Sequence, residues 1–387
     1  MEWKEVTLGE FMQCNPKRTI KKGQKARKIT MDLLIPHSKT IRNWNYEPYS
    51  SGAKFQNGDT IMARITPCLE NGKHAFVSIL DKGEIAYGST EYFVFCGKED
   101  VSDNDFVYYL TKTPLFRDTA IKSMVGSSGR QRAQMDVLEN LKMLVPKDIS
   151  DQRRIASILS SLDRKIELNN KINADLEEMA QAIFKNWFVD FEPFKDDKFV
   201  DSELGMIPEG WKVGSLGDFC NVFTGRKNTN QAIEKGLYPF FSCAPEPLAS
   251  NEAIFNGKAI IIAGNGSYTG RTSFYNGGFD LYQRTYACTI RERDKENLMI
   301  FFYHMMKQFF EPVKMGGTRG SSIPYIVMGD ITQQKFPYSE DWLLRFSNIA
   351  NSMMDKKLRI DKENSRLSLL RDTLLPRLMS GEIEIPE

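Results

Sequence analysis

Four glycine-rich loops carry the side chains with the clearest capacity for chemistry in this sequence. They span residues 64–73, 126–132, 264–271 and 316–322, and each combines a basic residue with Asn, Gln, Ser or Thr. Arginine can donate two hydrogen bonds to a guanine edge, and Asn or Gln can pair with adenine in a similar bidentate manner. Glycine and serine let backbone amides approach phosphates. The loops therefore predict a DNA-reading surface, although ordinary surface hairpins use the same residue types.

The predicted DNA-binding residues fall into two groups, one in each half of the chain. The first half supplies Lys17, Arg18, Lys21, Lys22, Arg64, Asn71, Lys73, Thr90, Ser127, Ser128, Arg130, Gln131 and Arg132. The second half supplies Arg226, Lys227, Asn265, Ser267, Tyr268, Arg271, Gln283, Arg284, Thr318, Arg319 and Ser321. Residues 17–28 hold seven basic residues and no acid, a density that suits phosphate contacts and equally suits a solvated loop.

No arrangement of residues predicts a catalytic site. The nearest match to a phosphate-binding loop, Gly205 to Gly210, is followed by Trp211 where the motif needs lysine. The turn at 264–270 lacks the G-x-G-x-x-G spacing of a dinucleotide site, and no helical pattern follows it. An amino-methyltransferase would be expected to carry an Asn/Asp-Pro-Pro-aromatic motif, whereas Asn15-Pro16 is followed by Lys17. No cluster of acids with a lysine stands out as a nuclease site.

Histidine and cysteine usage predicts neither a metal site nor disulfides. The three histidines are far apart, and the six cysteines stand singly without a C-x-x-C pair. No apolar run approaches the ~18 to 20 residues that a membrane helix needs, and the N-terminus does not resemble a signal peptide. We expect a cytoplasmic protein with no membrane contact and no cofactor of its own. The balance of 52 basic and 50 acidic residues neither favours nor excludes nucleic acid.

The sequence repeats itself, and its length allows several hydrophobic cores. Tryptophan, lysine, leucine, glycine and phenylalanine of residues 3–11 recur in 211–219 at a constant offset of 208. Residues 162–166 resemble 354–358 at an offset of 192, so the second copy is shorter in the middle. A strand-like run at 60–63 also has a counterpart at 259–263 in the second copy.

Each copy ends in a long helical pattern, the first over 150–191 and the second over 339–375, where Pro376 is expected to stop it. Their apolar residues recur about every 3.5 positions, which is typical of a coiled-coil seam. The seam residues are Ile155, Leu159, Leu162, Ile166, Leu176, Ile183, Phe346, Met353, Ile360, Leu367 and Leu374. A helix of ~40 residues would be ~60 Å long and would act as a spacer. Two separate amphipathic helices, each packed on its own domain, remain an alternative.

These patterns predict an α+β protein. The predicted segments are a mixed α and β domain at 1–149, a spacer helix at 150–191, a linker at 192–210, a second mixed domain at 211–338, and a final helix and tail at 339–387.

The sequence resembles the DNA specificity subunits of type I restriction-modification systems. The resemblance covers essentially the whole chain, and the motifs in the helices and the linker are the most specific to that family. The residues that carry it are 58–73, 88–91, 152–159, 184–194, 205–211 and 374–383.

The resemblance implies two globular target-recognition domains, each reading one half of a bipartite double-stranded DNA target. Two antiparallel helices forming a coiled coil would hold them apart, with an internal pseudo-two-fold repeat. It further implies two modification subunits that bind S-adenosylmethionine and methylate adenine, and restriction subunits that use ATP with Mg²⁺ as motors. This chain itself would be non-catalytic. The second domain lacks the motif found at 64–73. A self-contained methyltransferase or nuclease, and a coiled-coil scaffold without DNA readout, remain the alternatives.

Overall fold

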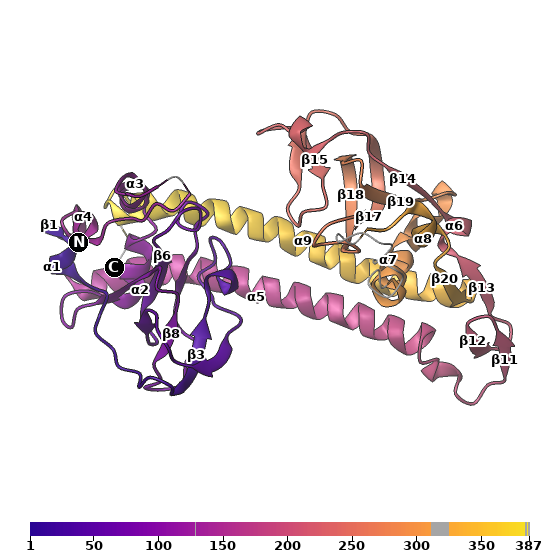
Figure 1. Ribbon diagram of the computed structural model, residues 1–387, viewed down its shortest axis with the longest axis horizontal. Helices are drawn as coiled ribbons and strands as arrows, with labels where there is room; N and C mark the ends of the chain where they lie inside the picture. The colour runs from indigo at the N-terminus through magenta and orange to yellow at the C-terminus, as the bar shows by residue number, and fades with distance from the viewer. Residues whose placement is uncertain (128, 311–324, 384, 386–387) are drawn as a thin grey trace. The chain divides into compact units, whose positions relative to one another are not determined.

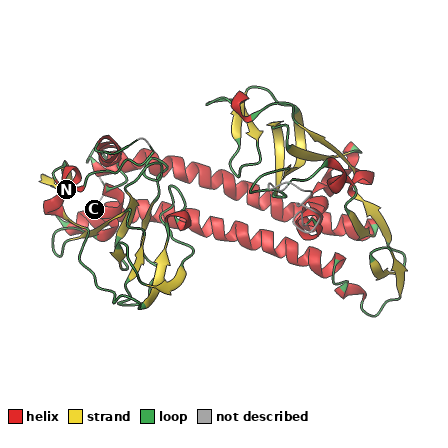
Figure 2. Ribbon diagram, in the orientation of Figure 1, coloured by secondary structure: helices red, strands yellow, loops and turns green. Residues whose placement is uncertain are grey.

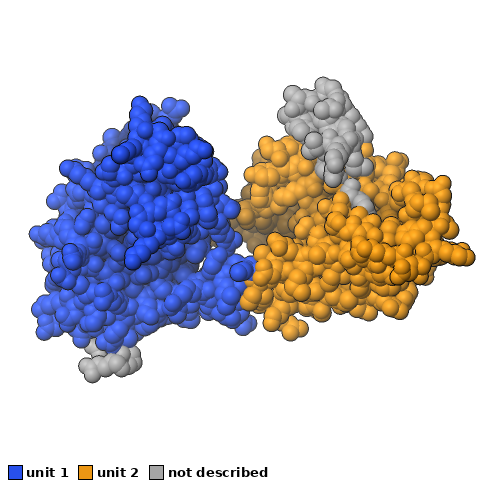
Figure 3. Space-filling model, turned by 90° about the horizontal axis from the view of Figure 1, so that it is seen from below, with its two compact units in different colours: residues 1–171, 361–387 blue, residues 172–360 orange. Residues whose placement is uncertain are grey.

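The computed structural model describes all residues except 128, 311–324, 384 and 386–387. It divides into two compact units, unit 1 with residues 1–171 and 361–387 and unit 2 with residues 172–360 (Figure 3). Both units combine helices with mainly antiparallel sheets, so the chain is a mixed α and β protein (Figure 2).

Unit 1 contains two four-stranded sheets and a two-stranded ribbon. Its strands are β1 (Trp3–Thr7), β2 (Met12–Cys14), β3 (Lys25–Ile29), β4 (Asn45–Pro48), β5 (Lys54–Phe55), β6 (Thr60–Ala63), β7 (His74–Phe76), β8 (Ala86–Gly88), β9 (Tyr92–Gly97) and β10 (Lys142–Pro146). Its short helices are α1 (Leu8–Phe11), η1 (Met31–Leu33), α2 (Asn104–Leu110), α3 (Pro114–Lys122) and α4 (Met135–Glu139). The sheets run in the orders β2-β9-β6-β7 and β4-β3-β8-β5, and β1 pairs with β10.

Unit 2 contains one six-stranded sheet, a ribbon and a hairpin. Its strands are β11 (Phe199–Ser202), β12 (Gly205–Pro208), β13 (Lys212–Ser215), β14 (Cys220–Thr224), β15 (Tyr238–Phe241), β16 (Leu248–Ser250), β17 (Phe255–Ala263), β18 (Thr272–Leu281), β19 (Thr285–Ile290) and β20 (Lys335–Tyr338). Its short helices are η2 (Glu192–Phe194), α6 (Leu216–Phe219), η3 (Thr229–Gln231), η4 (Arg293–Leu298), α7 (Met299–Phe309) and α8 (Met328–Thr332). The sheet order is β14-β19-β17-β18-β15-β16.

The same series of elements opens both units. A strand, a one-turn helix and a second strand follow one another as β1-α1-β2 and as β13-α6-β14. Thr7 with Glu10 and Ser215 with Asp218 form equivalent capping boxes, in which the carboxylate accepts from the backbone amide of the residue that precedes the helix. A Cβ at Gly9 would lie 3.3 Å from the carbonyl oxygen of Glu139, a tight contact that glycine avoids where α1 meets α4.

Strand β6 of the four-stranded sheet β2-β9-β6-β7 and one end of strand β17 of the six-stranded sheet are buried, because neighbouring strands and helices cover them. The run predicted at 60–63 is strand β6, and all four of its residues are buried. The run predicted at 259–263 forms the buried end of β17. Each lies between two antiparallel neighbours, β9 and β7 for β6, and β19 and β18 for β17.

Two long helices, α5 (Ile149–Phe188) and α9 (Glu340–Met379), each contribute to both units (Figure 1). The prediction that Pro376 stops the second helix is wrong, because α9 continues through Pro376 to Met379. Leu375, Leu378 and Met379 are buried in the core of unit 1. Their burial offsets the backbone hydrogen bond that proline cannot make.

The predicted seam residues lie on the covered faces of these helices. Four are buried, namely Ile155, Leu159, Phe346 and Ile360. The others are half-buried, namely Leu162, Ile166, Leu176, Ile183, Met353, Leu367 and Leu374. In unit 1 the seam joins a core with α2, and in unit 2 it joins an aromatic core that includes Phe184, Phe188 and Phe301.

Polar pairs recur along the middle of α5 and α9 at steps of seven residues. In unit 1, Asp163 accepts from Arg371 at 2.6 Å, and the Asn364 amide donates to Asn170 at 3.0 Å. In unit 2, Lys357 donates to Glu177 at 2.9 Å, and it contributes to a pKa of about 2 for that carboxyl. From Asp163 to Asn170 along α5, the partner on α9 moves back from Arg371 to Asn364. The two helices are therefore antiparallel within unit 1. A shift in register would separate these partners.

We expect Asp163→Ala to destabilise the protein by about 3 kcal/mol, because the buried Arg371 guanidinium loses a buried counter-ion and keeps only the exposed Asp372. Urea unfolding followed by circular dichroism measures this. Lys165→Ala, which removes an exposed ion pair with Glu363 on the same helices, is the control and should cost at most about 1 kcal/mol. Equal losses for the two variants would contradict a special role for the buried pair.

Candidate nucleic-acid interface

In unit 1, two of the predicted DNA-binding loops meet where strand β6 ends and strand β9 begins. The amide of Arg64 donates to the carbonyl of Glu91 at 3.0 Å, and the carbonyl of Arg64 accepts from Ala133 at 2.8 Å. Thr66 likewise donates to the carbonyl of Gln131 at 3.0 Å. Loops 64–73 and 126–132, far apart in the sequence, are therefore one surface.

Glu91 joins the side chains of these loops. Its carboxylate accepts from Arg132 Nε and Nη2 at 2.7 to 3.0 Å and from Arg64 Nε at 3.1 Å. The hydrogen bonds from Arg132 are the largest cause that lowers the pKa of Glu91, so the carboxylate stays ionised. The two guanidinium groups remain partly exposed, at 35% and 41%. The cluster carries one net positive charge at the surface.

Unit 2 repeats this backbone arrangement. Gly264 donates to the carbonyl of Arg284 at 2.9 Å, and the Gly264 carbonyl accepts from Ile326 at 2.9 Å. Ala263 also donates to the Arg271 carbonyl at 3.0 Å, as Ala63 does to Lys73 in unit 1 at 2.9 Å. The loop after β17 and the start of β19 are thus equivalent to the loop after β6 and the start of β9.

Several predicted DNA-binding cations are held by partners inside the protein. Lys73 donates to the carbonyl of Met31 at 2.7 Å, and Arg271 donates to the carbonyls of Ala244 and Pro245. Lys227 binds Asp280 at 2.7 Å, and this hydrogen bond is the largest cause of the raised pKa of the lysine. Arg18 makes a two-point contact with Asp59, whose side chain is 2% exposed. Through these contacts the four side chains stabilise the loops.

Other predicted cations are exposed, and their side chains make no hydrogen bond or ion pair with any residue that the structure describes. They are Lys17, Lys21, Lys22, Arg130, Arg226 and Arg284. Five predicted polar residues are exposed as well, namely Asn71, Thr90, Ser127, Ser267 and Tyr268. Asn265 accepts from the Cys243 thiol and Gln283 donates to Asn228. Gln131 is half-buried, and Ser128, Thr318, Arg319 and Ser321 lie outside the described residues.

Sequence reasoning did not single out the acids that hold these cations. Glu91, Asp59 and Asp280 bind Arg132, Arg18 and Lys227 respectively across 41 to 53 residues of sequence. Asp59 and Glu91 fall in the stretches 58–73 and 88–91 that carry the family resemblance, and Asp280 lies near a strand end, but no local pattern assigns any of them a partner.

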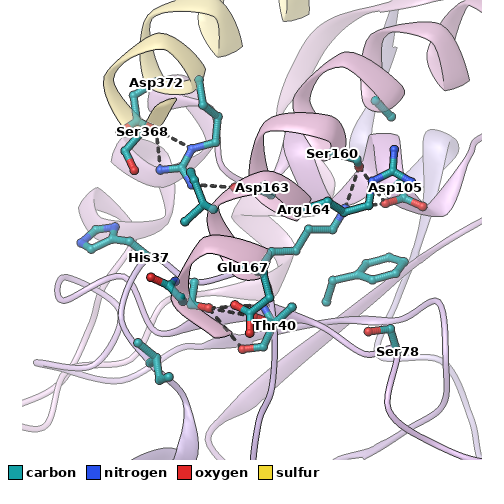
Figure 4. Close-up of a pocket in the computed structure, with 18 of the residues that line it drawn as sticks. His37, Thr40, Ser78, Asp105, Ser160, Asp163, Arg164, Glu167, Ser368 and Asp372 are labelled. Carbon is teal, nitrogen blue, oxygen red and sulfur yellow. Dashed lines mark hydrogen bonds and ion pairs between the residues drawn. The ribbon is translucent and has the colours of Figure 1, made fainter. Parts of the chain in front are cut away.

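A separate groove of about 890 Å³ lies in unit 1 along α5 and the loop around His37, Lys39 and Thr40 (Figure 4). Its charges balance, because Lys39 is paired with Asp105 at 2.5 Å and Arg42 with Glu167 at 3.0 Å. None of the described residues predicted to bind DNA lines it. The groove is therefore distinct from the loop surface.

The described residues offer no group of three or more His, Cys, Asp or Glu side chains that could hold a metal ion. The six cysteines are unpaired thiols, and burial raises the pKa of Cys220 to about 12. Among the described helices, none has the length and apolar character needed to span a membrane.

Comparison with known proteins also finds two corresponding stretches in the chain. The family model for the type I restriction modification DNA specificity domain matches two stretches, residues 1–178 and 208–339. The chain belongs to this family. Membership fixes the class of function as DNA specificity in type I restriction-modification. The matched stretches begin just before the two equivalent ribbons, at β1 and at β13.

Individual members of the family align over most of the chain. A type I restriction enzyme specificity subunit of Methanocaldococcus jannaschii, MjaIX, is 27% identical over 305 residues, covering 73% of this chain and 70% of that protein. The HindI specificity subunit of Haemophilus influenzae is 23% identical over 482 residues, covering 99% and 100%. The crystal structure of an S subunit from M. genitalium shares the fold, with a TM-score of 0.56 at 16% identity and coverage of 100% and 97%.

Because of the buried Arg18–Asp59 pair, substitutions at two neighbouring positions of the basic run at 17–28 should differ in their effect on stability. We expect Arg18→Ala to destabilise the protein by about 3 to 5 kcal/mol, because it leaves a buried carboxylate without its counter-ion. Lys17→Ala, at the exposed neighbouring position, should change stability by at most about 0.5 kcal/mol. Thermal unfolding of both variants decides this. An unchanged midpoint for Arg18→Ala would return Arg18 to the candidates for phosphate contact.

Proposed function

We propose that this specificity subunit reads a bipartite double-stranded DNA target, one half with unit 1 and the other half with unit 2. The observation that carries the proposal is the loop surface, which has the same backbone hydrogen bonds in both units. Each copy presents exposed arginine, Arg130 in unit 1 and Arg226 and Arg284 in unit 2. Guanidinium groups on loops suit both phosphates and guanine edges.

Within this proposal, residues 1–149 and 211–338 are the target-recognition domains. The helices of 150–191 and 339–387 form an antiparallel coiled coil between them, and 192–210, which contains the β11–β12 hairpin, is the connection. The whole chain follows a pseudo-two-fold repeat. The repeated series of elements and the heptad-spaced polar pairs support this arrangement.

The proposed DNA contacts divide by the state of each side chain. The exposed Lys17, Lys21, Lys22, Arg130, Arg226 and Arg284 would touch DNA, with the exposed polar residues of the same loops. The held side chains would chiefly fix the loops, because leaving the partner costs an ion pair for Arg18, Arg64, Arg132 and Lys227, and hydrogen bonds to backbone carbonyls for Lys73 and Arg271.

Catalysis is assigned to partner subunits. Two modification subunits would hold S-adenosylmethionine, and restriction subunits would use ATP and Mg²⁺, in a cytoplasmic complex built on this chain. The absence of a methyltransferase or nuclease motif in the sequence and the naming of the relatives as specificity subunits support this division of labour.

Binding and methyl transfer, measured on the same sample, test the proposal. The full-length chain should bind target duplex with an affinity that falls steeply as salt rises, because lysine and arginine release counter-ions from phosphates. It should transfer no methyl group from labelled S-adenosylmethionine until modification subunits are added. Methyl transfer by the chain alone would identify a self-contained enzyme, and salt-independent failure to hold DNA would identify a scaffold.

The helix pair leads to a prediction about the spacing of the half-sites. Inserting one heptad after Asn170 and one after Lys362 preserves the seam and lengthens each helix by ~10 Å. The preferred spacer should increase by about three base pairs, since base pairs are ~3.4 Å apart along each strand. The insertion also turns the far half-site by roughly 100° around the duplex, so affinity should fall as well. Binding to duplexes that differ only in spacer length measures the shift. A weaker affinity with an unchanged preferred spacer would show that the helices do not set the distance.

A further inference from the structure

The first position before strands β9 and β19 carries opposite charge in the two units. It is Glu91 in unit 1 and Arg284 in unit 2. The next residues, Tyr92 and Thr285, pair with Ala63 and Ala263 in the same antiparallel register. Both carbonyls also accept from the amide that follows the central strand, at 3.0 Å in unit 1 and 2.9 Å in unit 2. The backbone position is therefore the same, and only the side chain differs.

In unit 1 this position anchors the loop that contains Arg130. Glu91 binds Arg132 through two donors, and Arg132 pairs with Val125 through backbone hydrogen bonds of 2.9 and 3.0 Å that close the loop at its base. Gly126 and Gly129 have positive φ values of 136° and 79°, so the loop backbone depends on glycine at both places. The ion pair between Glu91 and Arg132 holds the base of the loop before any ligand binds, which reduces the entropy cost of binding.

A bare carboxylate at this place would repel DNA phosphates. Arg64 and Arg132 neutralise it and leave one net positive charge, and they lower the pKa of Glu91 so that the ion pairs persist in mild acid. One edge of the Arg132 guanidinium is occupied by Glu91, and its Nη1 lies 3.4 Å from the Arg130 carbonyl. Arg130 itself is exposed and makes no side-chain bond with the described residues.

In unit 2 the corresponding side chain, that of Arg284, does not anchor a loop in this way. Arg284 is exposed, and within the described part of the chain its guanidinium meets no hydrogen-bond or ion-pair partner. Tyr325, which pairs with Asn265, stands where Arg132 pairs with Ile65. The segment that contains Arg226 contacts the same turn, because the carbonyl of Lys227 accepts from the Gln283 amide at 3.0 Å. Arg226 itself is exposed.

We propose that Glu91 is a positioning residue that presents Arg130 to one DNA half-site, whereas Arg284, at the same backbone position of unit 2, contacts the other half-site directly. This inference rests on the proposed function. It makes the two units read DNA with arginines from different loops, although their backbones are equivalent.

The experiment uses the full-length chain assembled with its modification subunits, and a target first defined by methylome sequencing. Binding is measured to the intact duplex and to two duplexes with one or the other half-site scrambled. The variants are E91A, E91D, R130A, the double variant E91A/R130A and R284A. The matched controls are E99A and R293A, which remove exposed charges from unit 1 and unit 2.

We expect R130A to weaken recognition of one half-site by ~10-fold or more, a loss in the range of one base contact. E91A should weaken the same half-site, E91D should restore most of the binding, and the double variant should be little worse than R130A alone. Such non-additivity indicates that two residues act through one another. R284A should weaken only the other half-site, and both controls should bind as the wild type does.

Three results would overturn the inference. E91A could leave both half-sites unaffected, its loss could multiply fully with that of R130A, or R284A could act on neither half-site or on the same half-site as R130A. A full multiplication accompanied by a lower unfolding temperature would make Glu91 a structural residue only. Failure of the wild-type complex to prefer its own target would instead overturn the proposed function.

Discussion

The ion pair between Asp163 and Arg371 is the interaction on which the arrangement of unit 1 depends. It joins α5 and α9 through two residues that are 208 positions apart in the sequence, and both side chains are at most 9% exposed. Tyr109 donates to the same carboxylate at 2.6 Å, so helix α2 of the globular part is tied to the pair as well. A shift of this buried pair is costly, because Asp163 would lose its counter-ion and Arg371 would keep the exposed Asp372 alone. It sets the register that apolar packing leaves loosely defined.

Polar residues in a helix seam lower the stability of the helix pair but favour a single register. Leucine and isoleucine can pack in several registers, whereas Asn170 with Asn364, and Glu177 with Lys357, meet in one. The apolar anchors concentrate towards the helix ends, where Phe184 and Phe346 serve unit 2 and Leu159 and Leu375 serve unit 1. The apolar residues near the helix ends thus pack against the unit cores, and the polar pairs in the middle set the register.

Periodic and repeated features could be predicted from sequence, and side-chain partners could not. The repeat, the strands at 60–63 and 259–263 and the two long helices followed from spacing alone, because backbone periodicity fixes which residues share a face. The end of α9 was misjudged, since burial of Leu378 and Met379 is a tertiary effect that overrides proline. The glycine-rich loops are visible in the sequence, whereas the ion pairs within them are not. Glu91 lies 27 residues from Arg64 and 41 from Arg132, and no local pattern marks such a contact.

The division into a continuous and a discontinuous unit has a consequence for biosynthesis. Unit 2 is one uninterrupted stretch, residues 172–360, so all of its residues have been synthesised once that stretch is translated. Unit 1 begins earlier in the chain but lacks Arg371, Leu375 and Leu378 until α9 is translated. The part translated first is therefore the part completed last. Until then its exposed apolar residues and the unpaired Asp163 make the nascent first half the segment that chaperones and proteases can recognise.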